Sequence, residues 1–176
     1  NLTSEAEARA AIDAAATALG GIDVLVNVAG AFRWEKVDGG SIDTWDAMFA
    51  INLKTAVLAS RAALPHLGRS GAGRIVNIGA GAASKASVTG MGAYTASKAG
   101  VHRFTESLAD ELKDRGITVN AILPGTIDTP QNRADMPKAD TSRWVTPVQI
   151  AEVIAFLLSD AASGVSGAAV PVTGRG

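Results

Sequence analysis

Four short and almost wholly apolar runs, separated by longer helical stretches, constrain the fold of this chain most strongly. The runs cover residues 24–28, 74–78, 118–123 and 168–172. They are continuous rather than alternating, which is typical of strands buried on both faces of a parallel sheet. Helical periodicity is predicted over residues 4–19, 41–67, 91–115 and 147–158. The alternation predicts one doubly wound α/β domain.

Local signals at the ends of the predicted helices agree with this pattern. Ser4, with Glu7 three residues later, is typical of a capping box at the start of the first helix. Gly20 and Gly21 end that helix, and Gly116 ends the third. Each helix therefore has a predicted start or stop of its own.

The composition excludes several classes of protein. A chain of 176 residues with 47% hydrophobic residues and a mean hydropathy of +0.19 is one domain, residues 1–176, with a real core. The net charge of −1 and the 16 scattered basic residues do not favour nucleic-acid binding. Without cysteine there is no disulfide or thiolate metal site, and His66 and His102 are predicted at helix surfaces or ends rather than in a metal site. No membrane span or signal peptide is expected, so the predicted location is the cytoplasm.

Tyr94, the only tyrosine, lies four residues before Lys98 in the third predicted helix. This spacing places the phenol and the ammonium on one face, one turn apart. A phenol has a reference pKa of about 10, and a neighbouring cation favours its anion. The pair is therefore a candidate for proton transfer at neutral pH, although such pairs also occur by chance on surface helices.

Motifs along the chain resemble those of the short-chain dehydrogenase/reductase family, in order and spacing. The matching pieces are Asn27-Val28-Ala29-Gly30, Asn52 in Ile51-Asn52-Leu53, the Tyr94/Lys98 pair, and Pro124-Gly125 with Thr129. The resemblance covers essentially the whole chain. It implies a Rossmann-like fold, NAD or NADP as cofactor, and a small-molecule carbonyl or alcohol as substrate.

The resemblance also implies roles for individual residues. Tyr94 would be the catalytic acid/base, Lys98 would lower its pKa and bind the nicotinamide ribose, and Asn52 would hold a water beside Lys98. Asn52 could instead close a buried helical turn. The cofactor would contact Asn27, Ala29, Gly30, Tyr94, Lys98, Pro124, Gly125, Ile127 and Thr129. Gly30 and Pro124-Gly125 could equally be ordinary turn residues.

The chain departs from the family at the serine that binds the substrate oxygen. Matching the family's pattern places either Ala80 or Gly81 at that position, and neither has a hydroxyl. Ser84, Ser87 and Thr89 are nearby replacements if the loop is rearranged. Losing such a donor costs about 100- to 1000-fold in rate. A non-catalytic binding or assembly module of the same fold is therefore the alternative to an oxidoreductase.

A glycine-rich strand, turn and helix that would hold the pyrophosphate is not found in this sequence. We expect the fold to be incomplete in its N-terminal half and residues 24–28 to form an unpaired sheet edge. Either the sequence is an incomplete record of a longer protein, the favoured interpretation, or another chain covers the edge. The polypeptide as printed should bind a dinucleotide poorly.

Two further expectations concern the surface. Residues 130–145, polar and without periodicity, are predicted to form a mobile lid over the substrate, which ends near Trp144. Trp34 and Trp45 are predicted to be packing residues. The two long helices resemble those that pair in the family, so a homodimer or homotetramer is expected, with close approach at Ala56, Ala59, Ala62 and Ala63.

Overall fold

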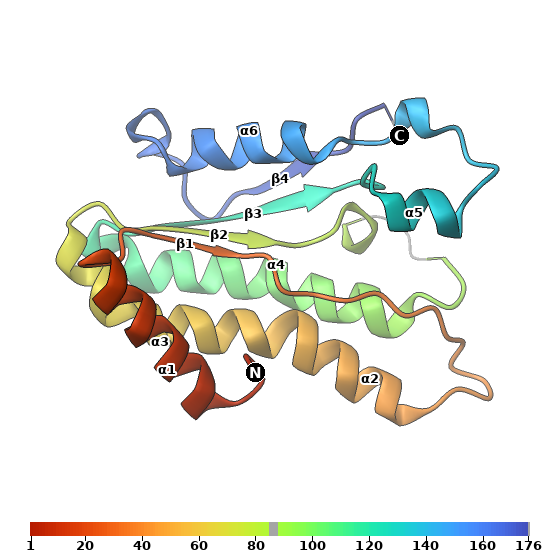
Figure 1. The fold of residues 1–176 in the computed structure, drawn as a ribbon, viewed down its shortest axis with the longest axis horizontal. Helices are drawn as coiled ribbons and strands as arrows, with labels where there is room; N and C mark the ends of the chain where they lie inside the picture. Colours follow the sequence, from red (N-terminus) through yellow and green to blue (C-terminus); the bar gives the residue numbers. More distant parts are fainter. Residues whose placement is uncertain (85–87, 176) are drawn as a thin grey trace.

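The fold is a parallel sheet between helices, as seen in a computed structural model that describes residues 1–84 and 88–175 (Figure 1). Four strands pair in parallel in the order β1-β2-β3-β4. The strands are β1 (Val24–Asn27), β2 (Arg74–Ile78), β3 (Thr118–Pro124) and β4 (Ala169–Val172). The α-helices are α1 (Glu5–Leu19), α2 (Ile42–Phe49), α3 (Thr55–Ser70), α4 (Gly92–Leu112), α5 (Pro130–Asp135) and α6 (Pro147–Leu158). The doubly wound α/β prediction is confirmed.

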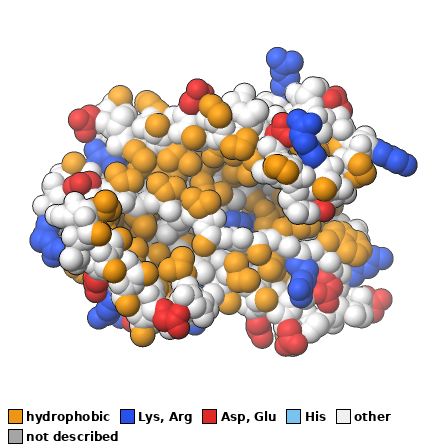
Figure 2. Space-filling view, in the orientation of Figure 1, with side chains coloured by type: hydrophobic (Ala, Val, Ile, Leu, Met, Phe, Trp, Pro, Cys, Tyr) orange, Lys and Arg blue, Asp and Glu red, His pale blue; other side chains and the backbone are white. Residues whose placement is uncertain are grey.

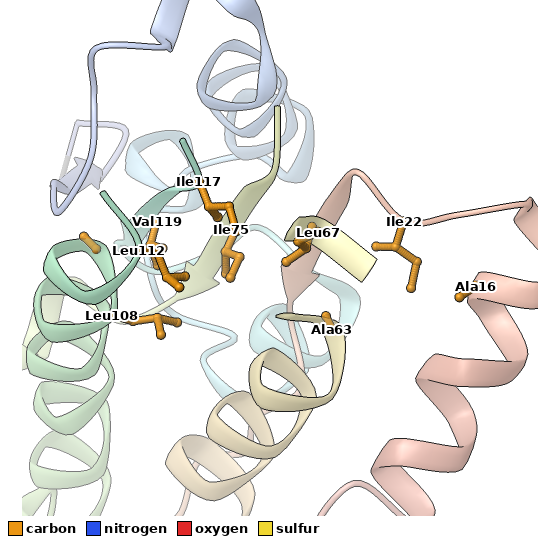
Figure 3. Packing of buried hydrophobic residues seen from close by; sticks show 10 residues of the cluster. Ala16, Ile22, Ala63, Leu67, Ile75, Leu108, Leu112, Ile117 and Val119 are labelled. Atoms are coloured by element: carbon orange, nitrogen blue, oxygen red, sulfur yellow. The ribbon is translucent and has the colours of Figure 1, made fainter. Parts of the chain in front are cut away.

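Successive residues of β2 enter different hydrophobic cores, as expected for a strand buried on both faces. Ile75 belongs to a cluster with residues of α1, α3, α4 and β3, part of which is drawn in Figure 3. Val76 belongs to a second cluster with residues of α6. In Figure 1, α6 accordingly lies on one side of the strands, and α1, α3 and α4 lie on the other.

The exposure of β1 differs from that of the inner strands. Every residue of β3 is buried, whereas none of the four residues of β1 is fully buried. β1 pairs only with β2, so one of its edges is unpaired, as predicted. Val24 is 39% exposed and Val28, just after the strand, is 66% exposed. Figure 2 shows hydrophobic side chains gathered across the face from which β1 is seen in Figure 1.

The helix boundaries follow the sequence signals. The Ser4 hydroxyl accepts a hydrogen bond from the Glu7 amide at 3.5 Å, which caps α1. Gly20 and Gly116 end their helical segments with φ of +77° and +66°, values that favour glycine.

The second predicted helix is a helical stretch, Ile42–Ser70, in which a π-helical segment at Ala50–Lys54 joins α2 to α3. Its length, and an 18-residue window within it with a mean hydropathy of 1.2, would by composition alone also suit a membrane span, although none was expected. However, Leu58 and Leu67 are buried and α3 packs on β1, so the stretch lies in the core of the fold. Three of the four alanines expected at a subunit contact, Ala56, Ala59 and Ala63, are buried within the chain. They are therefore not free to form the subunit contact expected of them.

A chain of buried amide and hydroxyl groups crosses from α3 to α4 beneath the strands. The Asn27 amide donates to Ser60 at 3.0 Å and to the carbonyl of the Asn77 side chain at 2.8 Å. Asn77 in turn donates to Thr105 at 2.9 Å. Asn77 is fully buried, so each of these groups depends on its protein partner for a hydrogen bond.

Replacing Asn77 by leucine should lower the free energy of unfolding by about 3 kcal/mol, because it removes one hydrogen bond from the part-buried Asn27 amide and one from the buried Thr105 hydroxyl. Urea denaturation measures the change. Thr17→Val, which removes an exposed hydroxyl that bonds to the Asp13 carbonyl, is the control and should change the value by less than about 0.5 kcal/mol. An equal effect of both substitutions would contradict the importance of the buried chain of hydrogen bonds.

Candidate active site

A cavity of about 940 Å³ opens where the strands end, at their carboxyl edge. Its wall brings together residues that follow β1, β2 and β3 with residues of α4 and of residues 130–145. This is the edge at which ligands bind in doubly wound sheets. The predicted site residues that line it are Gly30, Tyr94, Lys98, Pro124, Gly125 and Ile127.

Tyr94 and Lys98 reach the cavity from the first two turns of α4. The Tyr94 ring meets the Phe32 ring edge to face, with the ring centres 5.0 Å apart. Lys98 is 5% exposed, and its ammonium donates to the carbonyl of Ile78, the last residue of β2, at 2.7 Å. The one-turn spacing thus delivers both groups to the same space.

Burial governs the ionisation of both groups. It raises the pKa of the Tyr94 hydroxyl above its ordinary value. It also lowers the pKa of the Lys98 ammonium to about 8. The expectation that Lys98 lowers the pKa of Tyr94 is therefore not met in this structure: desolvation is the cause that acts on the phenol. At neutral pH the hydroxyl holds its proton and is suited to act as an acid.

Asn52 lies in the π-helical segment and joins the end of β1 to α4. Its side-chain oxygen accepts from the Ala31 amide at 2.8 Å, and its nitrogen donates to the Ser97 hydroxyl at 2.9 Å. A Cβ at Gly30 would lie 3.0 Å from the Asn52 oxygen and 3.0 Å from the Lys98 nitrogen. The glycine therefore lets the chain pass close to both polar groups. That Asn52 holds a water remains a prediction.

Asn27 and Ala29 do not line the cavity, although the sequence pattern included them with Gly30. The Asn27 side chain is engaged with Ser60 and Asn77 below the sheet. Its evident role is to hold β1 against β2 and α3. A cofactor contact through these two residues rests on the family resemblance alone.

Only part of the segment after β3 lines the cavity. Pro124, Gly125 and Ile127 line the cavity, and a Cβ at Gly125 would lie 3.1 Å from the Thr173 Cα. Thr129 instead caps α5, where its hydroxyl accepts from the Asn132 amide at 3.2 Å. This helix was missed because residues 130–145 were predicted to be irregular, although Thr129 followed by Pro130 is a usual helix start.

The wall after β2 offers no replacement serine among residues 78–84 and 88–91. Ala80 and Gly81 line the cavity, as matching to the family implied. Ser84 and Thr89 are exposed and do not line it; the Ser84 hydroxyl donates to the Gly81 carbonyl at 2.9 Å. Ser87 lies outside the described residues. Backbone and small side chains therefore form this part of the wall.

His102 is a residue whose position was predicted wrongly. It is 5% exposed rather than on a surface, and its Nε2 accepts a hydrogen bond from the Ala80 amide at 3.4 Å. Burial is the main cause that lowers its pKa; Arg103 and Lys98 act in the same direction and Glu106 opposes them. The signal was present, because His102 follows Lys98 by the same four residues that separate Lys98 from Tyr94.

Within residues 1–84 and 88–175, no group of three or more His, Asp or Glu side chains could hold a metal ion.

Comparison with known proteins decides the family. A family model described as enoyl-(acyl carrier protein) reductase matches residues 1–174. The chain belongs to the short-chain dehydrogenase/reductase family. As a member, it is an oxidoreductase that uses NAD or NADP and acts on a small molecule.

Individual relatives of this short-chain dehydrogenase/reductase cover almost its whole length. It is 35% identical to 2-(S)-hydroxypropyl-CoM dehydrogenase 3 of Xanthobacter autotrophicus, over 99% of this chain and 73% of the relative. It is 32% identical to the 3-oxoacyl-[acyl-carrier-protein] reductase FabG of Vibrio cholerae, over 99% and 74%. A 3-alpha-(or 20-beta)-hydroxysteroid dehydrogenase of Mycobacterium bovis is 34% identical, over 99% and 68%. All three names describe dehydrogenases or reductases, which favours the enzyme over the non-catalytic alternative.

Proposed function

We propose that this enzyme interconverts a carbonyl and an alcohol, with Tyr94 as the catalytic acid/base. The observation that carries the proposal is the meeting of the Tyr94 phenol and the Lys98 ammonium in one cavity at the carboxyl edge of the sheet. The names of the relatives, which include an oxoacyl reductase and two hydroxyl-compound dehydrogenases, support the same class of substrate.

The residues around the cavity suit the nicotinamide end of a dinucleotide. Gly30 and Gly125 carry no Cβ where the backbone passes close to Lys98 and Thr173. An ammonium has three donors, and the bond to the Ile78 carbonyl uses one of those of Lys98. The others can serve the ribose and the phenol. Pro124 and Ile127 would meet the carboxamide side, while the contacts proposed for Asn27, Ala29 and Thr129 would need their backbone groups.

The protein's part in the reaction is to supply and hold a proton. A bound nicotinamide provides or accepts the hydride. The Tyr94 hydroxyl, kept protonated by burial, donates its proton to the carbonyl oxygen of a substrate in reduction; in oxidation the phenolate form of Tyr94 takes the proton from the alcohol. Lys98, with a pKa of about 8, provides the positive charge that stabilises the phenolate left after donation. Asn52 positions the turn beside Lys98.

We further propose that residues 130–145 form the lid of the single domain, residues 1–176. Asn132, Met136, Asp140, Arg143 and Trp144 all line the cavity from this segment. Phe32, Met91 and Ile127 also line the cavity, which favours a substrate with an apolar body. Trp34 lies over Gly90, outside the lining, and is 56% exposed.

A cytoplasmic homodimer or homotetramer is the proposed form of the protein. The named relatives are enzymes of small-molecule metabolism, and short-chain dehydrogenases commonly form oligomers. Ile42 and Phe49 are exposed apolar side chains on α2, which belongs to one of the two helices expected at the contact. They replace the buried alanines as the candidate contact residues.

Turnover is tested with a panel of apolar ketones and secondary alcohols, each with NADH and NADPH or their oxidised forms. We expect carbonyl reduction, followed through the loss of nicotinamide absorbance, with at least one ketone. Because only the protonated form of Tyr94 can give a proton to the carbonyl oxygen, we expect the rate of reduction to fall as the pH rises through the pKa of the phenol. Cofactor binding without turnover over the whole panel would contradict the proposal and favour a binding module.

A further inference from the structure

Two consecutive peptide groups at the end of β2, Ile78–Gly79 and Gly79–Ala80, are held by three different partners. The Ile78 carbonyl accepts from the Lys98 ammonium at 2.7 Å. The Gly79 amide donates to the Ile122 carbonyl of β3 at 2.8 Å. The Ala80 amide donates to Nε2 of His102 at 3.4 Å. Two of the three partners are therefore side chains one turn apart on α4.

The direction of the third bond fixes the state of the imidazole. A backbone amide can only donate, so Nε2 of His102 carries no proton and the ring is neutral, with its proton on Nδ1. The ring is 5% exposed and follows Lys98 on the same helix face. An apolar side chain at this position would leave the Ala80 amide without its partner.

Gly79 is the residue that makes room for the ring. A Cβ at this position would lie 2.5 Å from Nε2 of His102 and 2.8 Å from a methyl carbon of Leu123. Neither neighbour is an exposed flexible tip, because His102 and Leu123 are both buried. The glycine and the histidine are therefore complementary: the ring reaches the Ala80 amide through the space that the missing side chain leaves.

The backbone segment of residues 78–81 forms a wall of the active site. Ile78, Gly79, Ala80 and Gly81 line the cavity that Tyr94 and Lys98 share. Ala80 has no hydroxyl with which to bind a substrate, so the shape of this wall depends on its backbone. A shift of the Ile78–Ala80 peptides would also move the carbonyl that anchors the Lys98 ammonium.

We infer that His102 is a positioning residue of the active site. It fixes the wall formed by residues 78–81 and, through the Ile78 carbonyl, the position of the Lys98 ammonium. The inference rests on the proposed function for its effect on turnover, and on the structure alone for its effect on the Ala80 amide. Misplacement of catalytic groups by about 1 Å can cost about 100-fold in rate. We therefore expect loss of the hydrogen bond to lower kcat about tenfold or more.

A matched pair of variants tests the hydrogen bond. His102→Gln keeps an acceptor at this position, whereas His102→Leu fills similar space without one. We expect kcat to fall about tenfold or more in His102→Leu and to stay within about threefold of the wild type in His102→Gln. Cofactor dissociation constants and thermal midpoints are measured alongside. Equal kcat values in the two folded variants would overturn the inference.

A second pair separates positioning from packing. Gly79→Ala should lower both stability and kcat, because the added methyl group meets the ring. The double variant Gly79→Ala with His102→Ala gives the methyl group space but provides no acceptor. We expect the double variant to be more stable than Gly79→Ala and still slow. Recovery of kcat together with stability would show that the ring only fills space, which overturns the inference.

Hydrogen exchange at the Ala80 amide gives a readout that needs no activity. We expect exchange at least about tenfold faster in His102→Leu than in the wild type, and near wild-type exchange in His102→Gln. If the wild type reduces no ketone, the proposed function fails while this measurement still decides the anchoring role. Unchanged exchange in His102→Leu would overturn that role whatever the activity.

Discussion

Replacing Tyr94 by phenylalanine should lower kcat by about 1000-fold and leave the dissociation constant of the cofactor within about threefold of the wild type. Positioned acid/base groups contribute about 100- to 10,000-fold, and only the hydroxyl is removed. The ring remains, so the edge-to-face contact with Phe32 at 5.0 Å is kept. Steady-state kinetics and fluorescence titration with reduced cofactor measure the two quantities.

Phe104→Leu is the control for this substitution. Phe104 also lies on α4, but it packs against the cluster that contains Leu108 and Val119, away from the cavity. Its loss should lower stability and change kcat by less than about threefold. If the Tyr94 variant kept more than about a tenth of wild-type kcat, another group would have to supply the proton.

Replacing Lys98 by methionine should lower kcat about 100-fold, weaken cofactor binding and change how stability depends on pH. The first two effects follow from the loss of the cation beside the phenol and of the donors proposed for the ribose. Burial lowers the pKa of Lys98 from 10.5 to about 8, so between these values the unfolded chain holds more protons than the folded one. Stability then rises with pH in this window.

The size of this change in the free energy of unfolding depends on which part of the interval between the two pKa values of Lys98 the measurement covers. Each pH unit contributes about 1.4 kcal/mol, so from pH 7 to pH 9 Lys98 should add about 1.4 kcal/mol to the free energy of unfolding of the wild type. This increment should be missing from Lys98→Met. Lys113→Met removes an exposed lysine that pairs with Asp110 and should keep the increment. Denaturant unfolding of the three proteins at both pH values measures it; an identical pH dependence in all three would contradict a depressed pKa at Lys98.

The strands could be predicted because burial on both faces leaves a continuous apolar run. All four were found within a residue or two of their positions, and the exposed edge at β1 followed from the strand order. The helix predicted over residues 147–158 matches α6, and the structure shows the capping box of Thr146 and Gln149 that starts it. These features depend on local chemistry, which a sequence displays directly.

Features that depend on partners distant in sequence were missed or misplaced. The π-helical segment around Asn52 has no periodicity of its own to reveal it. Asn27 stood in a recognisable motif, yet its side chain bonds to Ser60 and Asn77, which are 33 and 50 residues away. His102 was predicted at the surface, because its four-residue spacing from Lys98 indicates a shared helix face but does not show that Gly79 leaves room for the ring in the core.

The direction in which the pKa of Tyr94 shifts also could not be predicted from the sequence. A cation one turn away predicts a lowered value, while desolvation predicts a raised one, and only the structure shows which dominates. With its pKa raised by burial, the phenol is suited to give a proton to a carbonyl oxygen.

We expect hydride transfer in this cavity to depend on a proton from Tyr94, and isotope transfer gives the sharpest test of this dependence. A single-turnover reduction is run with NADH or NADPH that carries deuterium at both positions of the nicotinamide C4, using the wild type and Tyr94→Phe at equal cofactor occupancy. The wild type should place one deuterium at the new alcohol carbon, and Tyr94→Phe should form the same product about 1000-fold more slowly. Deuterium transfer at equal rates in the two proteins, or an alcohol product without deuterium, would contradict this expectation.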